Sequence, residues 1–396
     1  MFRSGTTLIA RMLNTHPEII LASDTLIEFF RMFRNEIYAQ NEIKIPSKDL
    51  PLEDFFKSKN QKSRKLIDES NFKIPIINTD LEELKNLIKN RSELFSPVFC
   101  NNLESFNGET FAEIFDELLF TMKKSYIKEN SKVLGFKVTW SEQFATTFLN
   151  KFSKNGKVLF VIRDPRATIG SNFAMRNHRY PLEFLIRNWR KSVLYAILCS
   201  KIISKYQDNV MILNYENLIE YPEIEIKKII KFLELEFSDK LLDPKNFKDG
   251  GGKSWTQNSS FKQRSSTFNK NAINNWRKVI DKKTQKFIEY ACFPEMILMG
   301  YKPELVSKED LKKKCNYPLD VQNEIAVWIQ KFYSLDQLKD QNWLKNVEKS
   351  HKKRNEVLLL SLNNQSYVEE NKKIIEEYFI DIEYFKYLQN MNLDEL

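Results

Sequence analysis

Short, mostly apolar runs alternate with longer amphipathic stretches over the first three quarters of the chain. The runs are rich in valine, isoleucine, leucine and phenylalanine, which is typical of buried strands. They lie at 19–21, 133–136, 157–162 and 210–213. The longer stretches carry apolar residues at helical spacing and lie at 8–13, 25–38, 81–90, 108–129, 140–153, 181–205 and 222–234. This alternation predicts an α/β fold with a central parallel sheet flanked by helices.

The last part of the chain, residues 303–396, follows a different pattern. It is highly charged, and its apolar residues recur at helical spacing. One predicted helix face carries Val321, Ile325, Trp328 and Ile329. We expect a helical C-terminal extension that packs on the α/β part rather than a second catalytic module. The predicted domains are therefore 1–302 and 303–396, and a hydrophobic share of 42% with 30 Phe is sufficient for a core.

Composition excludes several classes of protein. No run of about 18 apolar residues could span a membrane, and polar residues after Arg3 argue against a signal peptide. Four widely spaced cysteines and three histidines contain no CxxC pattern, so we expect reduced thiols, no metal site and a cytoplasmic protein. The net charge of +9 is consistent with a polyanionic cofactor or an acidic acceptor, and equally with a lysine-rich surface that aids solubility, which we favour. The basic clusters at 312–314 and 351–354 are too short to predict nucleic-acid binding.

The first residues of the chain form a candidate anion site. Arg3-Ser4-Gly5-Thr6-Thr7 leads directly into the amphipathic stretch at 8–13. Backbone N–H groups at a helix start lack partners, and the helix dipole favours an anion there. Arg3 adds a full positive charge. The stretch does not match the GxxxxGK[ST] pattern of the P-loop, and a capped surface helix is the alternative.

A second stretch adds to this interpretation. The strand at 157–162 is followed at once by Arg163, and Ser171 comes eight residues after Arg163. Together with the loop 3–7 and His16-Pro17, these residues resemble the sulfotransferases that use 3′-phosphoadenosine 5′-phosphosulfate (PAPS). The resemblance covers about residues 1–302 and is closest to the branch of bacterial and tyrosylprotein sulfotransferases.

The resemblance implies a P-loop-like three-layer fold and a role for each motif residue. Arg3, with Ser4, Gly5, Thr6 and Thr7, would bind the 5′-phosphosulfate end of PAPS, and Arg3 would also contact the leaving oxygen. Arg163 and Ser171 would bind the 3′-phosphate through forked donors and a hydroxyl. Ser260, in the long loop 243–270, is a weaker candidate for a cofactor contact. Arg166 is expected to pair with Asp164 or a glutamate instead.

The catalytic base is assigned to an acidic residue shortly after His16-Pro17. Asp24 lies eight residues after His16, although the resembling enzymes commonly carry a glutamate there. Glu28 is the rival, four residues later on the same helical face if Asp24 lies in the first turn. Asp24 could instead cap the helix predicted at 25–38. Lys137, at the end of the strand 133–136, would stabilise charge on the bridging oxygen, and a solvated lysine is the alternative.

The beginning of the sequence lacks one expected element. A strand normally precedes a phosphate-binding loop, because the strand end fixes the loop's position. Here only Met1 precedes Phe2, whereas the resembling proteins carry a hydrophobic strand upstream. Either translation starts further upstream, or the fold tolerates the loss and leaves two neighbouring strands with unpaired edges. We favour the first explanation.

These observations predict a sulfotransferase that moves a sulfuryl group from PAPS to a hydroxyl without a metal. The acceptor could be a carbohydrate, a peptide tyrosine or a small molecule. A P-loop nucleotide kinase is an alternative, although the Walker lysine is missing. A non-catalytic nucleotide-binding or interaction protein is the third.

Overall fold

The computed structural model describes residues 2–44, 47–52, 61–126, 128–175, 179–248, 268–318, 325–362, 364 and 366–391. Its contacts divide the chain into two compact units. The first comprises Met1–Glu53, Lys62–Ile162 and Lys205–Lys270, and the second comprises Asp54–Gln61, Arg163–Ser204 and Asn271–Leu396. The predicted division at residue 302 does not coincide with these units and stays a prediction.

The first unit contains all four strands of the described residues. Strand β1 (Ile19–Ser23) pairs with β2 (Val133–Lys137) in parallel, and β3 (Val158–Ile162) pairs with β4 (Val210–Asn214) in parallel. The predicted strands and their parallel direction are confirmed. The described strands form two separate hydrogen-bonded pairs, so the single central sheet stays a prediction.

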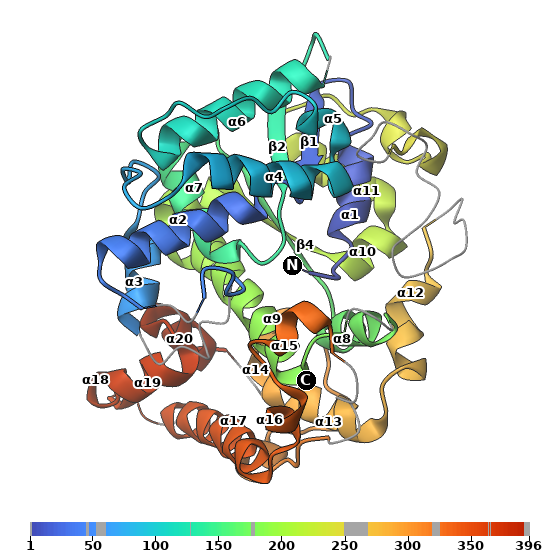
Figure 1. Ribbon diagram of the computed structural model, residues 1–396. Helices are drawn as coiled ribbons and strands as arrows, with labels where there is room; N and C mark the ends of the chain where they lie inside the picture. Colours follow the sequence, from blue (N-terminus) through green and yellow to red (C-terminus); the bar gives the residue numbers. More distant parts are fainter. Residues whose placement is uncertain are drawn as a thin grey trace. The chain divides into compact units, whose positions relative to one another are not determined.

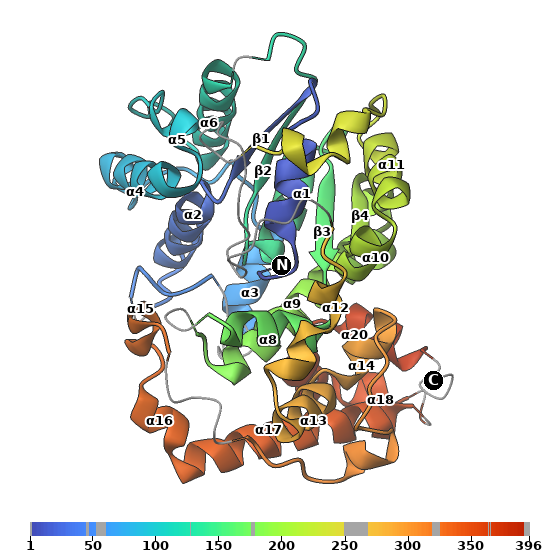
Figure 2. The ribbon, with the colours of Figure 1, turned by 90° about the vertical axis from the view of Figure 1, so that its right-hand side faces the viewer.

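Helices cover the strands of the first unit on both sides (Figures 1 and 2). Helices α1 and α6 pack on β1 and β2, whereas α10 and α11 pack beside β4. In Figure 2, α1 lies between the two strand pairs. The helices are α1 (Thr6–Leu13), α2 (Ile27–Gln40), α3 (Gln61–Glu69), α4 (Leu81–Phe95), α5 (Pro97–Cys100), α6 (Phe111–Ser125), α7 (Ala145–Lys151), α10 (Tyr215–Glu220) and α11 (Pro222–Phe232).

A cluster of phenylalanine rings forms the core beneath α2 and α6. Phe33 contacts Phe111 with ring centroids 5.1 Å apart, and Phe72 stacks on Phe115 at the same distance. Phe29, on α2, lies within 6 Å of both Phe111 and Phe115. These five side chains are almost fully buried, so burial of large apolar area stabilises the position of α2.

Lys128 fixes the connection between α1 and β1. Its ammonium group donates to the carbonyl oxygens of Asn14 at 2.6 Å, His16 at 3.0 Å and Ile19 at 2.6 Å. The three N–H donors of a lysine are thus matched to three acceptors just past the end of a helix, where the dipole also favours a cation.

We expect Lys128→Met to lower the free energy of unfolding by about 2–4 kcal/mol, because three carbonyls lose a charged donor. The measurement is a shift in the urea midpoint. Lys132→Met is the control: Lys132 is 65% exposed and pairs with Glu18, so its loss is expected to cost less than about 1 kcal/mol. Equal shifts in both variants would contradict the structural role of Lys128.

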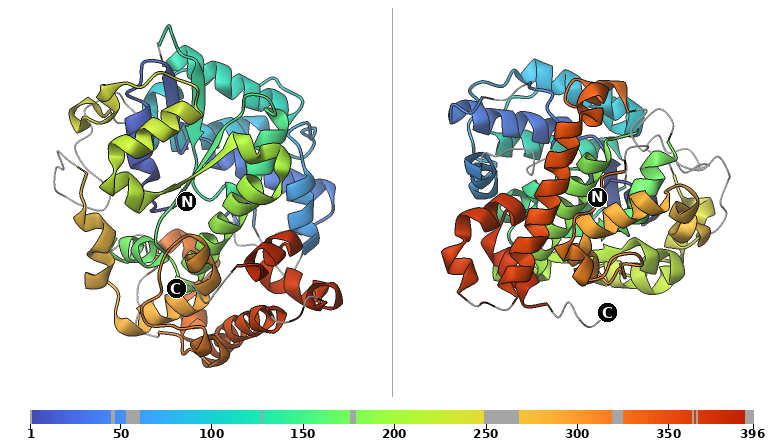
Figure 3. Two further views of the ribbon diagram at one scale, coloured as in Figure 1. Left: turned by 180° about the vertical axis from the view of Figure 1, so that it is seen from behind. Right: turned by 90° about the horizontal axis from the view of Figure 1, so that it is seen from below.

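The second unit is helical throughout its described residues. Its elements before residue 302 are α8 (Pro165–Phe173), α9 (Leu182–Ile197), which continues as a π-helical turn (Leu198–Ile202), α12 (Asn271–Asn274), α13 (Lys282–Ala291) and α14 (Phe293–Leu298). The later ones are α15 (Val327–Gln330), α16 (Leu335–Lys339), α17 (Gln341–Ser361), α18 (Tyr367–Glu370), α19 (Lys372–Phe379) and α20 (Ile382–Gln389). Figure 3 shows these later helices in orange to red.

Candidate active site

The loop before α1 has the backbone of an anion-binding turn. Arg3 and Gly5 both adopt left-handed conformations, with φ of 61° and 80°. Gly5 is the N-cap of α1 and makes no side-chain cap hydrogen bond, and the first turn of that helix contains no acidic residue. The Ser4 side chain is fully buried, and its Oγ has no hydrogen-bond partner within the described part of the chain. The loop and α1 together therefore suit a phosphate or sulfate group.

Tyr215 closes the other side of this loop. A Cβ atom on Gly5 would lie 2.2 Å from Cδ2 of Tyr215, so only glycine fits between the loop and the ring. Tyr215 is 5% exposed and begins α10, directly after β4. The sequence contained the segment 214–218, which resembles a Tyr-Glu-Asp-Leu segment of the family, but nothing in it indicated contact with Gly5.

Asp24 and Lys137 meet at the carboxyl ends of two paired strands. The register places Ser23 opposite Lys137, and the Asp24 N–H donates to the Lys137 carbonyl at 2.7 Å. The Lys137 ammonium donates to Asp24 Oδ2, so the two side chains form an ion pair. Thr139 Oγ1 also lies 3.5 Å from Asp24 Oδ1. The two predicted catalytic residues are therefore adjacent.

Asp24 is not a helix cap. Helix α2 begins at Ile27, its N-cap is Leu26, and no side chain caps it. Asp24 adopts a left-handed φ of 56° before the helix, which turns its carboxylate toward Lys137 rather than toward the N–H groups of α2. This result corrects the capping alternative, and it removes the premise that Asp24 and Glu28 share a helical face.

Glu28 occupies a different environment from Asp24. It lies in the first turn of α2, is 9% exposed, and accepts from Arg31 at 2.7 Å. Burial raises the pKa of Glu28, although Arg31 and Arg91 act in the opposite direction. Its carboxylate is thus hydrogen-bonded to Arg31, whereas the Lys137 ammonium is bonded to Asp24. The assignment of Asp24 rather than Glu28 as the base stays a prediction.

An aromatic pair links the loop to the end of β2. The rings of Phe2 and Trp140 lie 5.1 Å apart, and the Arg3 guanidinium lies 5.9 Å from the Phe2 ring. Trp140 has a left-handed φ of 67° and follows Lys137 by three residues. The contact brings the loop before α1 beside the end of β2, where Lys137 lies. The sequence analysis did not identify Trp140, because no local sequence pattern predicts its left-handed backbone or its contact with Phe2.

Arg163 and Ser171 belong to the second unit. Arg163 is 7% exposed; its Nη2 donates to the Ala272 carbonyl at 2.6 Å. Its own carbonyl accepts from Nε1 of Trp189 at 2.8 Å. Ser171 lies on α8.

Arg166 is committed to two carboxylates, as expected. It donates to Asp164 and, at 2.8 Å, to Glu289, which is fully buried. The side chain of Asp164 also accepts from the backbone N–H of Arg166 and so caps α8. Arg166 therefore anchors α8 rather than serving as a free cation. Ser260, the remaining predicted cofactor contact, lies outside the described residues.

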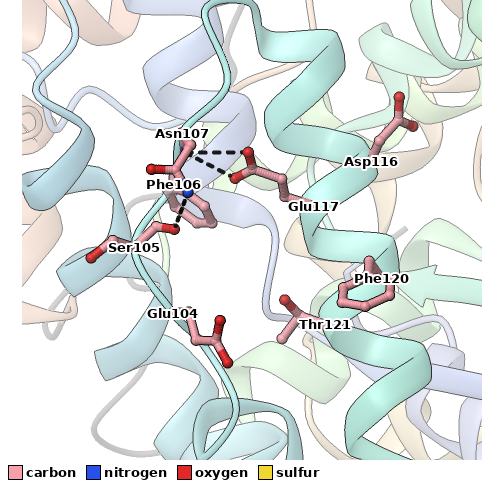
Figure 4. A pocket seen from close by; sticks show the side chains of 8 residues that line it. All are labelled: Glu104, Ser105, Phe106, Asn107, Asp116, Glu117, Phe120 and Thr121. Atoms are coloured by element: carbon pink, nitrogen blue, oxygen red, sulfur yellow. Dashed lines mark hydrogen bonds between the residues drawn. The ribbon is translucent and has the colours of Figure 1, made fainter.

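A pocket of about 340 Å³ lies elsewhere in the first unit, between residues 104–107 and α6 (Figure 4). None of the predicted site residues lines it. Its carboxylates are occupied: Glu117 accepts from the Asn107 N–H at 3.2 Å, and Asp116 pairs with Lys151 at 2.8 Å. The pocket therefore lies apart from the residues predicted to carry the chemistry.

Metal-binding clusters and membrane-spanning helices are both absent from the described residues. They contain no group of three or more histidine, cysteine, aspartate or glutamate side chains that could hold a metal ion. None of their helices is both long and apolar enough to cross a membrane.

Known proteins are similar to this chain over much of its length. A protein-tyrosine sulfotransferase of Drosophila melanogaster is 22% identical over 255 residues, which cover 62% of this chain and 39% of that protein. Protein-tyrosine sulfotransferase A of Caenorhabditis elegans is 22% identical over 249 residues, which cover 61% of this chain and 50% of that protein. The chain thus spans half or less of the length of these relatives.

Two solved structures are also similar. The sulfotransferase domain from the curacin biosynthetic pathway has a TM-score of 0.42 at 16% identity, over 76% of this chain and 95% of that domain. The sulfotransferase domain from the Synechococcus PCC 7002 olefin synthase has a TM-score of 0.42 at 15% identity, over 76% of this chain and 92% of that domain. A family model described as the sulfotransferase family matches residues 1–239. Because this match covers more than half of the chain, the chain belongs to the sulfotransferase family.

Proposed function

We propose that this chain transfers a sulfuryl group from PAPS to a hydroxyl of an acceptor. The observation that carries the proposal is the Asp24–Lys137 ion pair, which lies at the paired strand ends beside the anion-binding loop. Membership of the sulfotransferase family supports PAPS as the donor. When bound, PAPS supplies the sulfuryl group and a phosphate leaving group that needs cations rather than a metal.

The loop residues fit the 5′ end of this donor. The uncapped start of α1 presents backbone N–H groups, and the buried Oγ of Ser4 adds a donor without a partner among the described residues. Arg3 would neutralise charge on the phosphate, and Thr6 and Thr7 would supply hydroxyl groups. These roles correspond to the P-loop-like layout that we propose for this part of the fold.

Asp24 and Lys137 would act on the acceptor and on the leaving oxygen. The Asp24 carboxylate can accept the proton of an acceptor hydroxyl as a general base. The Lys137 ammonium can stabilise the charge that develops on the bridging oxygen. Their contact with each other, and the bond from the Asp24 N–H to the Lys137 carbonyl, hold both groups at one strand end.

Arg163 and Ser171 would bind the 3′-phosphate. We expect Arg163→Gln to weaken binding of 3′-phosphoadenosine 5′-phosphate by about 10- to 100-fold, because a charged, forked donor is lost. Binding of AMP, which lacks the 3′-phosphate, should not change. Calorimetric titration of both nucleotides measures the difference.

Arg277→Gln is the control for Arg163→Gln. Arg277 is 46% exposed and pairs with Glu304, and it has no predicted role in nucleotide binding. An equal loss of affinity for both nucleotides in Arg163→Gln would contradict the assignment to the 3′-phosphate.

Labelled PAPS with a panel of hydroxyl acceptors tests the activity. The panel should include tyrosine peptides, since two relatives are named protein-tyrosine sulfotransferases, as well as carbohydrates and phenols. Label transfer to any acceptor supports the proposal. Magnesium-dependent ATP binding without binding of 3′-phosphoadenosine 5′-phosphate would favour a kinase, and binding of neither nucleotide would favour a non-catalytic protein.

A further inference from the structure

Helix α9 holds the backbone of Arg163. The Trp189 indole, which is fully buried on α9, donates to the Arg163 carbonyl at 2.8 Å. A buried carbonyl that accepts from a rigid indole cannot move without losing that bond. The position of α9 therefore sets the position of Arg163.

A buried hydrogen bond between Glu183 and His351 ties α9 to the long C-terminal helix α17. His351 Nε2 lies 2.8 Å from Glu183 Oε2, and both side chains are about 95% buried. Burial alone would raise the pKa of Glu183, but His351 and Arg187 outweigh it and lower that pKa to about 2. Glu183 is thus ionised in the first turn of α9, where the helix dipole also favours an anion.

A second buried link lies about two helical turns further along α9 and about one turn further along α17. Glu295 of α14, which is 1% exposed, accepts from Arg354 of α17 and lies 3.6 Å from Nε of Arg190 of α9. Arg190, the residue next to Trp189, also donates to the Tyr378 carbonyl at 3.1 Å. Residues that follow position 302 therefore hold α9 on both sides of Trp189.

Buried polar links, including the ion pairs of Glu295, contribute little net stability, because desolvation offsets their attraction. What they specify is geometry, since a shifted helix would leave charges buried without partners. We propose that the C-terminal helical segment is a positioning element for Arg163, with His351 and Trp189 as positioning residues. The inference rests on the proposed role of Arg163 in binding the 3′-phosphate.

The experiment compares two nucleotides in full-length variants. His351→Gln removes the imidazole that bonds to Glu183, and Trp189→Phe removes the indole N–H while it keeps a buried ring. Each is expected to weaken binding of 3′-phosphoadenosine 5′-phosphate about 3- to 10-fold and to leave AMP binding unchanged. The double variant should lose less than the product of the two factors, since both residues act through one contact.

Lys352→Gln is the matched control on α17. Its side chain is 41% exposed and faces Glu356, so neither affinity should change. If His351→Gln does not fold, Glu183→Gln weakens the same link, keeps an oxygen opposite His351, and should give the same selective loss.

The outcomes separate the inference from the function on which it rests. Unchanged affinity for 3′-phosphoadenosine 5′-phosphate in a folded His351→Gln, or equal loss for both nucleotides, would overturn the positioning role alone. A wild-type chain that binds this nucleotide no more tightly than AMP would refute the 3′-phosphate site itself, and the inference with it.

Discussion

Asp24→Asn is expected to lower kcat by about 10²- to 10⁴-fold, which is the usual contribution of a general base. The asparagine oxygen can still accept from Lys137, so the geometry at the ends of β1 and β2 should survive. Affinity for 3′-phosphoadenosine 5′-phosphate should therefore stay near that of the wild type. Single-turnover transfer from labelled PAPS and calorimetric titration measure the two quantities separately.

Glu28→Gln is the matched control for Asp24→Asn. Glu28 forms an ion pair with Arg31, whereas Lys137 is paired with Asp24. Its substitution should therefore leave kcat within about twofold, well short of the loss of a general base. Full activity in Asp24→Asn together with a large loss in Glu28→Gln would transfer the role of base to Glu28.

Asp24 and Lys137 could be named from the sequence, but their contact could not be predicted. Asp24 and Lys137 are 113 positions apart, and only the parallel register of β1 and β2 brings them together. That register depends on how the two strands pack within the first unit, which no local pattern specifies. The left-handed backbone at Asp24 was equally hidden, because side chains other than glycine rarely adopt it. The helical capping interpretation failed for that reason.

Longer-range packing accounts for the other differences between the predicted and the observed structure. The apolar runs predicted all four strands, yet whether they form one sheet depends on which edges pair, and the described residues form two pairs. In the C-terminal segment the helical period was visible. The bond between His351 and Glu183, 168 positions apart, could not be read from either helix alone, because each polar residue there resembles a solvated surface position.

The second large effect is expected at Gly5. Gly5→Ala should weaken binding of 3′-phosphoadenosine 5′-phosphate by at least about 100-fold, equivalent to roughly 3 kcal/mol. Two causes add. Alanine is strained at a φ of +80°, and its Cβ would overlap the Tyr215 ring at 2.2 Å. Either the ring or the loop must shift, and a shifted loop no longer directs its N–H groups at the phosphosulfate end.

Gly300→Ala measures the cost of backbone strain alone. Gly300 has nearly the same φ, +78°, but a Cβ there would meet no atom within 4 Å. It should lose about 1–2 kcal/mol of stability from backbone strain alone and keep full nucleotide affinity. Adding Tyr215→Ala to Gly5→Ala removes the overlap but not the strain, so a partial recovery of affinity is expected. Wild-type affinity in Gly5→Ala would show that the loop does not bind the nucleotide. Loss without recovery would assign the effect to strain, because only the overlap depends on Tyr215.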